Sequence, residues 1–190
     1  MKANTEPLGA AARLATLCQS GAASQTVWSS LDAVLGEVFG HKLFTVLLFD
    51  GAGERVVRVY SSRPEINPVG GIKPVTPSMW TTKVLIDGQP YIGGSKSDLR
   101  EVFPDFETLW AIGCESVLNI PIRHAGKVVG SLNLLDGPAN YTPADIDVAR
   151  LFAQLVTTAA LADQARVLGT RQSELDLGRQ NVQNGYWIQN

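Results

Sequence analysis

The sequence predicts an α+β domain in which helices pack on one side of a single antiparallel sheet. Two pairs of apolar, β-favouring segments, at residues 43–60 and 116–135, are each divided by a short turn that contains glycine. A segment with helical periodicity precedes the first pair, at residues 24–39, and another follows the second pair from residue 145. Helices placed before and after two strand pairs favour an antiparallel sheet with a helical layer.

Two helices are expected before the first strand pair. Residues 7–20 are rich in Ala and Leu and end before Gly21. The second helix has Ser24 as its expected N-cap and Gly40 as its stop signal. Its apolar residues recur at helical spacing and are Val27, Leu31, Val34, Leu35 and Val38.

The first strand pair is expected to form a hairpin of residues 43–49 and 55–60, joined by a turn at residues 50–53. The first of these strands is almost entirely apolar, which suits a central strand covered on both faces. Residues 61–77 hold four prolines and a glycine pair, so we expect a long irregular loop there, with a functional or mobile role.

Short elements are expected between the two hairpins. The pattern favours a short helix at residues 78–85, an extended piece at 89–93 and a second short helix at 103–112. The second hairpin then consists of residues 116–122 and 128–135.

The last helix has the clearest start signal. Thr142 is a suitable N-cap, Pro143 suits the first helical position, and Asp145 completes a capping box. Gly169 weakens any continuation of this helix, and residues 184–185 end it. The apolar residues expected on its buried face are Val148, Leu151, Phe152, Leu155, Val156 and Ala159.

This helix carries more apolar residues than one buried face uses, among them Leu161, Val167 and Leu168. Several alanines near them permit a close approach of another helix. We therefore expect a homodimer through the terminal helices, with a monomer whose tail covers these residues as the alternative.

Size, charge and cysteine content exclude several classes of protein. The chain has 190 residues and a formal net charge of −2, so it offers no basic excess for nucleic acid or an anionic membrane. Cys18 and Cys114 cannot form a disulfide framework, and no stretch approaches the roughly 18 apolar residues of a membrane span. We expect a cytoplasmic protein that needs no metal or cofactor.

Motifs in and before the second hairpin resemble those of the GAF domain family. Gly113 and Ser116 fit a Gly-x-x-Ser pattern, Pro121 lies near the end of an apolar strand, and residues 130–132 fit a Gly-x-Leu strand. Residues 83–91 resemble the short helix and strand that the family has further upstream.

The resemblance covers about residues 22–165 and implies a GAF-like fold with six antiparallel strands. It places the N- and C-terminal helices on one face of the sheet and a ligand pocket on the other, beneath segments around residues 61–113. Residues 1–21 would then be an N-terminal helix, and residues 166–190 a C-terminal helical extension and tail.

Strand alternation places Asn119, Ser131 and Asn133 on one face of the second hairpin, opposite its apolar face. They form either a solvent-facing surface or, as the resemblance favours, the polar floor of a pocket. Between loop and hairpin lies an aromatic group that either covers the core or stacks on a flat ligand. It consists of Trp80, Tyr91, Phe103, Phe106 and Trp110.

These observations favour a ligand sensor or binding protein for a small neutral or heterocyclic metabolite. The alternatives are a small-metabolite enzyme using Asp98, Glu115 or Cys114 in hydrolysis, proton transfer or thiol chemistry, and a dimerisation or adaptor module. Cys114 is the candidate reactive group, but His124 is expected at the far end of its hairpin and no base is expected beside it. GAF-type free methionine-R-sulfoxide reductases carry acidic residues where this chain has Val117 and Asn133, which counts against that chemistry.

Overall fold

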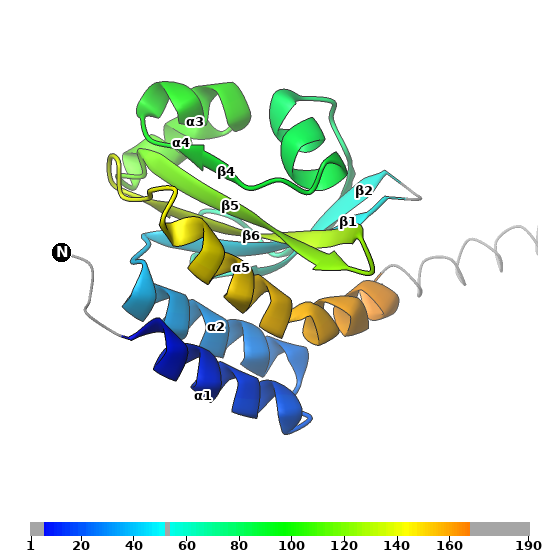
Figure 1. The fold of residues 1–190 in the computed structure, drawn as a ribbon. Coiled ribbons are helices and arrows are strands. Elements are labelled where there is room, and N and C mark those ends of the chain that lie inside the picture. The colour runs from blue at the N-terminus through cyan, green and yellow to red at the C-terminus, as the bar shows by residue number, and fades with distance from the viewer. Residues whose placement is uncertain (1–5, 52–53, 168–190) are drawn as a thin grey trace, which may run out of the picture.

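A computed structural model describes residues 6–51 and 54–167 of the chain. Its centre is a six-stranded sheet with the order β3-β2-β1-β6-β5-β4, in which neighbouring strands pair antiparallel. Helices α1, α2 and α5 lie on one side of the sheet, and a segment of short helices lies on the other (Figure 1). The predicted α+β class and the six-stranded antiparallel sheet are confirmed.

The helical layer consists of α1 (Pro7–Gln19), α2 (Ser24–Val38) and α5 (Asp145–Leu155), with α1 in contact with both of the others. Helix α2 begins at Ser24 as its first helical residue, so the predicted N-cap role falls to Ala23, which makes no side-chain cap. After one non-helical residue, Val156, the chain is helical again over residues 157–167. The predicted continuation, with Gly169 and residues 184–185, lies outside the described residues.

Both predicted hairpins are present in the sheet. The first is formed by β1 (Leu43–Asp50) and β2 (Arg55–Ser61), and the second by β5 (Ser116–His124) and β6 (Lys127–Asp136). Strands β1 and β6 pair with each other and join the two hairpins at the centre of the sheet.

The two edge strands are β3 (Gly70–Pro74) and β4 (Tyr91–Gly93). Strand β3 falls within residues 61–77, where a wholly irregular loop was expected, so that prediction is wrong for these residues. Glycine and proline are tolerated on an edge because only one side of the strand must pair.

The sheet face away from the helical layer is covered by residues 79–90 and 94–111, on either side of β4. They form the π-helix η1 (Thr81–Ile86), α3 (Lys96–Val102) and α4 (Phe106–Ala111). Helix α3, which begins with a capping box between Ser95 and Asp98, was not predicted from the sequence. We call residues 79–90 and 94–111 the covering segment.

Alternation along the strands divides the buried residues between two cores. The larger core lies between the sheet and the helical layer and includes Trp28, Phe44, Leu134 and Phe152. The smaller core lies beneath the covering segment and includes Leu43, Leu109 and Cys114. Among the described residues, no helix is long and apolar enough to cross a lipid bilayer.

Gly130 explains the Gly-x-Leu pattern of β6. It pairs with Leu48 of β1, and a Cβ atom at this position would lie 2.4 Å from the carbonyl oxygen of Leu47. Only glycine allows the two central strands to approach this closely.

Candidate functional site

A row of polar side chains crosses the sheet on the face beneath the covering segment. Cross-strand pairing places Asn119 of β5 beside Asn133 of β6, and Asn133 beside Thr45 of β1. Tyr91 of β4 and Ser61 of β2 extend the row at its two ends. As predicted, one face of the second hairpin carries Asn119, Ser131 and Asn133. This face lies beneath the covering segment, and all three residues are buried.

Hydrogen bonds join the row into one network. Trp80 Nε1 donates to Asn119 Oδ1 at 3.0 Å, and Asn119 Nδ2 donates to Asn133 Oδ1 at 2.7 Å. Ser131 Oγ also donates to Asn133 Oδ1, at 3.1 Å, and Asn133 Nδ2 lies 3.3 Å from Thr45 Oγ1. The amides largely satisfy one another, which explains how so many polar atoms are buried at low cost.

A small cavity lies at one end of this network. Its volume is about 50 Å³, enough for one or two water molecules at roughly 30 Å³ each. Thr45 and Asn133 line it from the sheet, and Phe103 and Leu109 line it from the covering segment. The remaining lining residues are Leu43, Leu47, Arg58, Asn67, Asp105 and Leu135.

Asn67 is a polar residue of this cavity whose side chain has no partner among the described residues. It is 6% exposed, and its side chain makes no hydrogen bond with any residue that the structure describes, although its amide atoms are not fully shut off from solvent. Burial of an amide without a partner is unfavourable, so a molecule inside the cavity would gain hydrogen bonds from Asn67.

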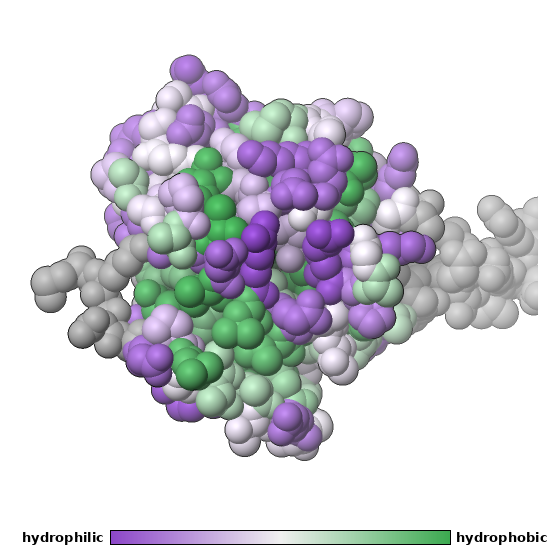
Figure 2. Space-filling view, viewed as in Figure 1, coloured by the Kyte–Doolittle hydropathy of each residue, from purple (hydrophilic) through white to green (hydrophobic). Residues whose placement is uncertain are grey.

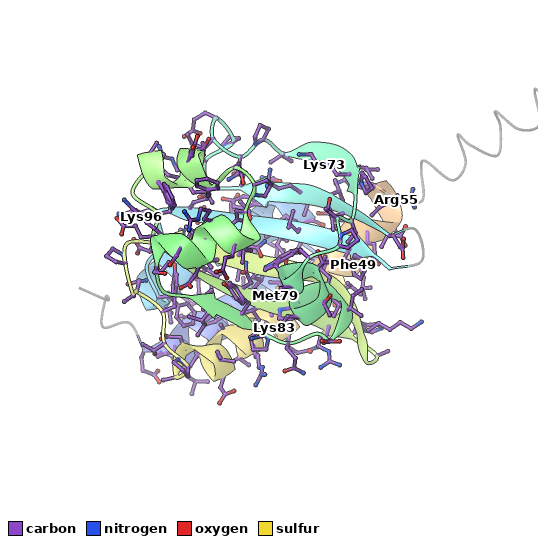
Figure 3. The ribbon with its side chains drawn as sticks, turned by 90° about the horizontal axis from the view of Figure 1, so that it is seen from above. Phe49, Arg55, Lys73, Met79, Lys83 and Lys96 are labelled. Atoms are coloured by element: carbon purple, nitrogen blue, oxygen red, sulfur yellow. The ribbon has the colours of Figure 1, made fainter. Side chains whose placement is uncertain are left out.

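An outer groove of about 390 Å³ lies next to the cavity. Leu47 and Arg58 line both hollows. The other lining residues of the groove come from β2, from β3 and from the residues just before it, and are Val56, Pro68, Val69, Gly70, Gly71 and Lys73. Seen from above, Lys73 lies toward the same end of the sheet as Arg55 and Phe49, far from Lys96 (Figure 3).

The predicted aromatic residues occupy different places. Phe103 lines the small cavity, and Trp80 bonds to Asn119 above the polar row. Tyr91 is buried in the smaller core, with Lys83 Nζ 5.7 Å from its ring centre. Trp110 packs against Phe106 with ring centres 4.7 Å apart, and it lines neither hollow.

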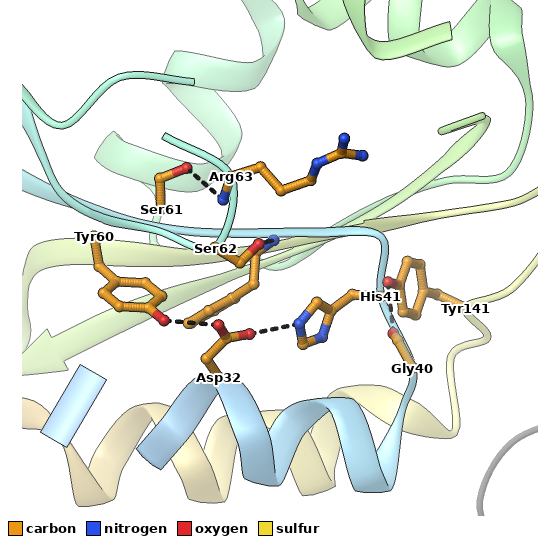
Figure 4. Close-up of polar contacts among 9 residues, drawn as sticks. Asp32, Gly40, His41, Tyr60, Ser61, Ser62, Arg63 and Tyr141 are labelled. Atoms are coloured by element: carbon orange, nitrogen blue, oxygen red, sulfur yellow. Dashed lines mark hydrogen bonds and ion pairs between the residues drawn. The ribbon is translucent and has the colours of Figure 1, made fainter. Parts of the chain in front are cut away.

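Cys114 is fully buried in the smaller core. Burial raises the pKa of its thiol to about 11, so little thiolate forms at neutral pH. His124 lies at the far end of β5, and His41 Nε2 bonds to Asp32 at 2.6 Å on the helical side of the sheet (Figure 4). No described group of three His, Cys, Asp or Glu residues is arranged to hold a metal ion.

Asp32 connects the helical layer to the sheet. Besides His41, it accepts a hydrogen bond from Tyr60 of β2 at 2.7 Å (Figure 4). Burial and this bond raise the pKa of Tyr60 to about 12. The cluster holds α2 against β1 and β2, on the face away from the cavity.

Sequence reasoning missed Thr45, Arg58, Asn67 and Asp105. Alternation along residues 43–49 carried the signal for Thr45, which follows Leu43 and precedes Leu47 on one face. Alternation along residues 55–60 does not show which face of the sheet carries Arg58, because a bulge between β1 and β2 shifts the pairing after Val46. Asn67 lies in an irregular stretch, where no periodicity indicates which way its side chain points.

Comparison with known proteins gives a family match for the sequence and similar solved structures for the fold. The sequence model of the GAF domain family matches residues 23–159. No curated protein matches the chain. The fold is similar to the GAF domain of an Acinetobacter phosphoenolpyruvate-protein phosphotransferase, with a TM-score of 0.67, 14% identity and coverage of 83% of this chain and 94% of that one.

Two further solved structures have the same fold. One is the phycoerythrobilin-bound GAF domain of a cyanobacterial phytochrome, with a TM-score of 0.65, 12% identity and coverage of 86% of this chain and 98% of that one. The other is the GAF domain of a two-component sensor histidine kinase from Bacillus halodurans, with a TM-score of 0.58, 16% identity and coverage of 75% and 96%.

Proposed function

Because the chain belongs to the GAF domain family, we propose that it binds a small organic molecule between the sheet and the covering segment, as a ligand sensor or binding protein. The observation that carries this proposal is the buried amide of Asn67 at a cavity that is also lined by Thr45 and Asn133. Amide and hydroxyl groups both donate and accept hydrogen bonds, so they suit a neutral or heterocyclic group on the ligand.

Binding in this cavity requires the covering segment to move. A volume of about 50 Å³ is far below the roughly 300–1,000 Å³ of ligand pockets. Phe103 and Leu109 would be displaced, and Trp80 and Trp110 are the aromatic residues that we propose to contact the ligand in the open form. Tyr91, Asn119 and Ser131 would support the site from the sheet.

Catalysis has weaker support than binding. The groups that an enzyme would use are engaged in the fold: Cys114 is buried with a raised pKa, and Asp98 accepts hydrogen bonds from the backbone of Gly94 and Ser95. Glu115 pairs with Lys96 at 3.6 Å. We therefore place binding ahead of an enzymatic role.

We also propose that the protein is a cytoplasmic homodimer that associates through α1 and α5. Figure 2 shows apolar side chains gathered over the helical layer. Leu8 of α1 is 67% exposed, and Leu151 of α5 is 43% exposed, so its predicted place on the buried face of this helix is wrong. The same surface would serve a dimerisation or adaptor module. A bound metabolite would favour the ligand sensor or binding protein, and its absence would favour the dimerisation or adaptor module.

Thermal unfolding with a metabolite library tests the binding function. A ligand of the native state raises the melting temperature, because its binding adds about 2.7 kcal/mol to the unfolding free energy at a hundredfold excess over Kd. The variant Asn67→Leu should lose this shift while it unfolds like the wild type without ligand. Ile66→Leu, in the same turn, is the control. Retention of full affinity in Asn67→Leu would contradict the proposed site.

A further inference from the structure

Arg58 stands between the small cavity and the outer groove. It pairs with Leu47 of β1 and with Gly70 of β3, and its side chain lines both hollows. Its Nη1 donates to the carbonyl oxygen of Pro68 at 3.0 Å, whereas its Nε is buried and has no hydrogen-bond partner among the described residues. The edge of the guanidinium formed by Nε and Nη2 therefore has no acceptor among the described residues, and a ligand reaches Nε only when the residues that bury it move aside.

The charges around Arg58 are unbalanced on the groove side. The described residues that line the outer groove include the cations Arg58 and Lys73 and no carboxylate. Asp105 lines the inner cavity and attracts Arg58, but the two side chains form no ion pair within 4.0 Å. Burial lowers the pKa of Arg58, which reflects the cost of a cation that lacks a close partner.

Apart from Arg58 and Lys73, the groove is lined by apolar residues and glycines. Leu47, Val56 and Val69 provide hydrocarbon surface next to the guanidinium, and the volume of about 390 Å³ is at the lower end of ligand pockets. A bound molecule would thus have an apolar or aromatic body beside one anionic group.

We infer that the ligand of this site is a small organic carboxylate, held by the Nε and Nη2 edge of Arg58 with its body along Leu47. The inference rests on the proposed binding function and replaces a purely neutral ligand with a heterocyclic or apolar body that carries an acid. A carboxylate matches the planar edge of a guanidinium with two parallel hydrogen bonds. It also supplies the partner that Arg58 Nε lacks, which removes the cost of a buried donor without an acceptor.

Isosteric acid and amide pairs test the inference. Nicotinate with nicotinamide, and benzoate with benzamide, differ mainly in charge, and phenyl phosphate and inorganic phosphate test a different anion. We expect the acids to raise the melting temperature, to bind at least about tenfold tighter than the amides, and to shift the Arg58 Nε–H signal in ¹⁵N-arginine spectra. Arg58→Gln identifies that signal by its loss.

The variants separate charge from geometry. Arg58→Gln should abolish the preference for acids, and Arg58→Lys should retain only part of it, because an ammonium lacks the planar edge. Arg100→Gln removes the same charge from an exposed position on α3 and should bind the acids like the wild type. The melting temperature without ligand shows that each variant folds.

The outcomes are distinct for the two proposals. Equal binding of acids and amides, or unchanged acid binding by Arg58→Gln, would overturn the carboxylate inference and leave the binding function in place. Tighter binding of phenyl phosphate than of benzoate would overturn the choice of carboxylate. Absence of binding by every probe at millimolar concentration, together with no hit in the metabolite library, would overturn both.

Discussion

Asn133 sits at the centre of the polar row, where its oxygen accepts from Asn119 and Ser131 and its nitrogen lies within hydrogen-bond distance of Thr45. Strand alternation correctly assigns it to the face away from the larger core. Alternation alone predicts that Asn133→Leu leaves folding nearly intact. Because Asn133 is buried in a hydrogen-bond network, we expect instead that this substitution destabilises the fold.

Asn133→Leu should lower the free energy of unfolding by about 1–3 kcal/mol, because two donors and the Thr45 hydroxyl lose their buried partner. Urea denaturation measures the change. Thr45→Val, which removes a single hydroxyl contact at nearly constant volume, should cost less. Equal stability of Asn133→Leu and the wild type would show that water reaches this row.

The two thiols should differ in reactivity. Cys114 is fully buried and has a pKa raised to about 11, so its thiolate is scarce below that pH. Burial also raises the pKa of Cys18, but this residue on α1 is only partly buried. A thiol reagent at pH 8 should modify Cys18 in the native protein, and Cys114 only after denaturation. Comparison with Cys18→Ser identifies each site, and rapid labelling of Cys114 in the native protein would contradict its burial.

At the scale of elements, the approach of β1 to β6 is the tightest constraint in the sheet. Gly130→Ala places a methyl group 2.4 Å from Leu47 O, a backbone atom that cannot move aside. We expect a loss of about 3 kcal/mol or more, or a failure to fold, since overpacking of this kind costs typically 1–3 kcal/mol even where side chains can yield. Melting temperature and soluble yield report the effect.

Gly94→Ala is the matched control for this prediction, because a Cβ atom there meets nothing within 4 Å. It should melt close to the wild type. A Gly130→Ala protein as stable as Gly94→Ala would mean that the two strands separate more easily than their pairing indicates.

Most elements with strong local signals were predicted from sequence, with α3 and its capping box as the exception, whereas the edge strand that depends on a distant partner was not. The hairpins of β1–β2 and β5–β6 follow from apolar alternation between turns. Strand β3 could not be predicted, because a Gly- and Pro-rich edge strand forms only where β2 offers a partner. The site divides in the same way: Asn119, Ser131 and Asn133 follow from alternation, whereas Arg58 and Asn67 meet Asp105 and Asn133 only through tertiary packing.

At the scale of the whole molecule, the helical layer is the surface where we expect a second copy to bind. Leu151→Glu should dissociate the dimer, because a carboxylate buried in an apolar interface pays a large desolvation cost. Light scattering should give about 41 kDa for the wild type, twice the 20.4 kDa chain, and about half of that for the variant.

Ile86→Glu is the control for this prediction. Ile86 is as apolar as Leu151 and 63% exposed, but it lies on η1, on the other side of the sheet. It should leave the mass unchanged. A wild-type mass near 20 kDa that does not rise with concentration would contradict the dimer.

The unequal size of the two hollows has a kinetic consequence. In the proposed binding mode, a ligand would meet Arg58 first, in the larger groove, at a rate set by diffusion and charge attraction. It reaches Thr45 and Asn133 only when the covering segment moves, so a stopped-flow trace should show a fast phase that rises with concentration and a slow phase that levels off. The plateau of the slow phase reports how often α4 lifts from the sheet, and the same motion sets the lifetime of the complex.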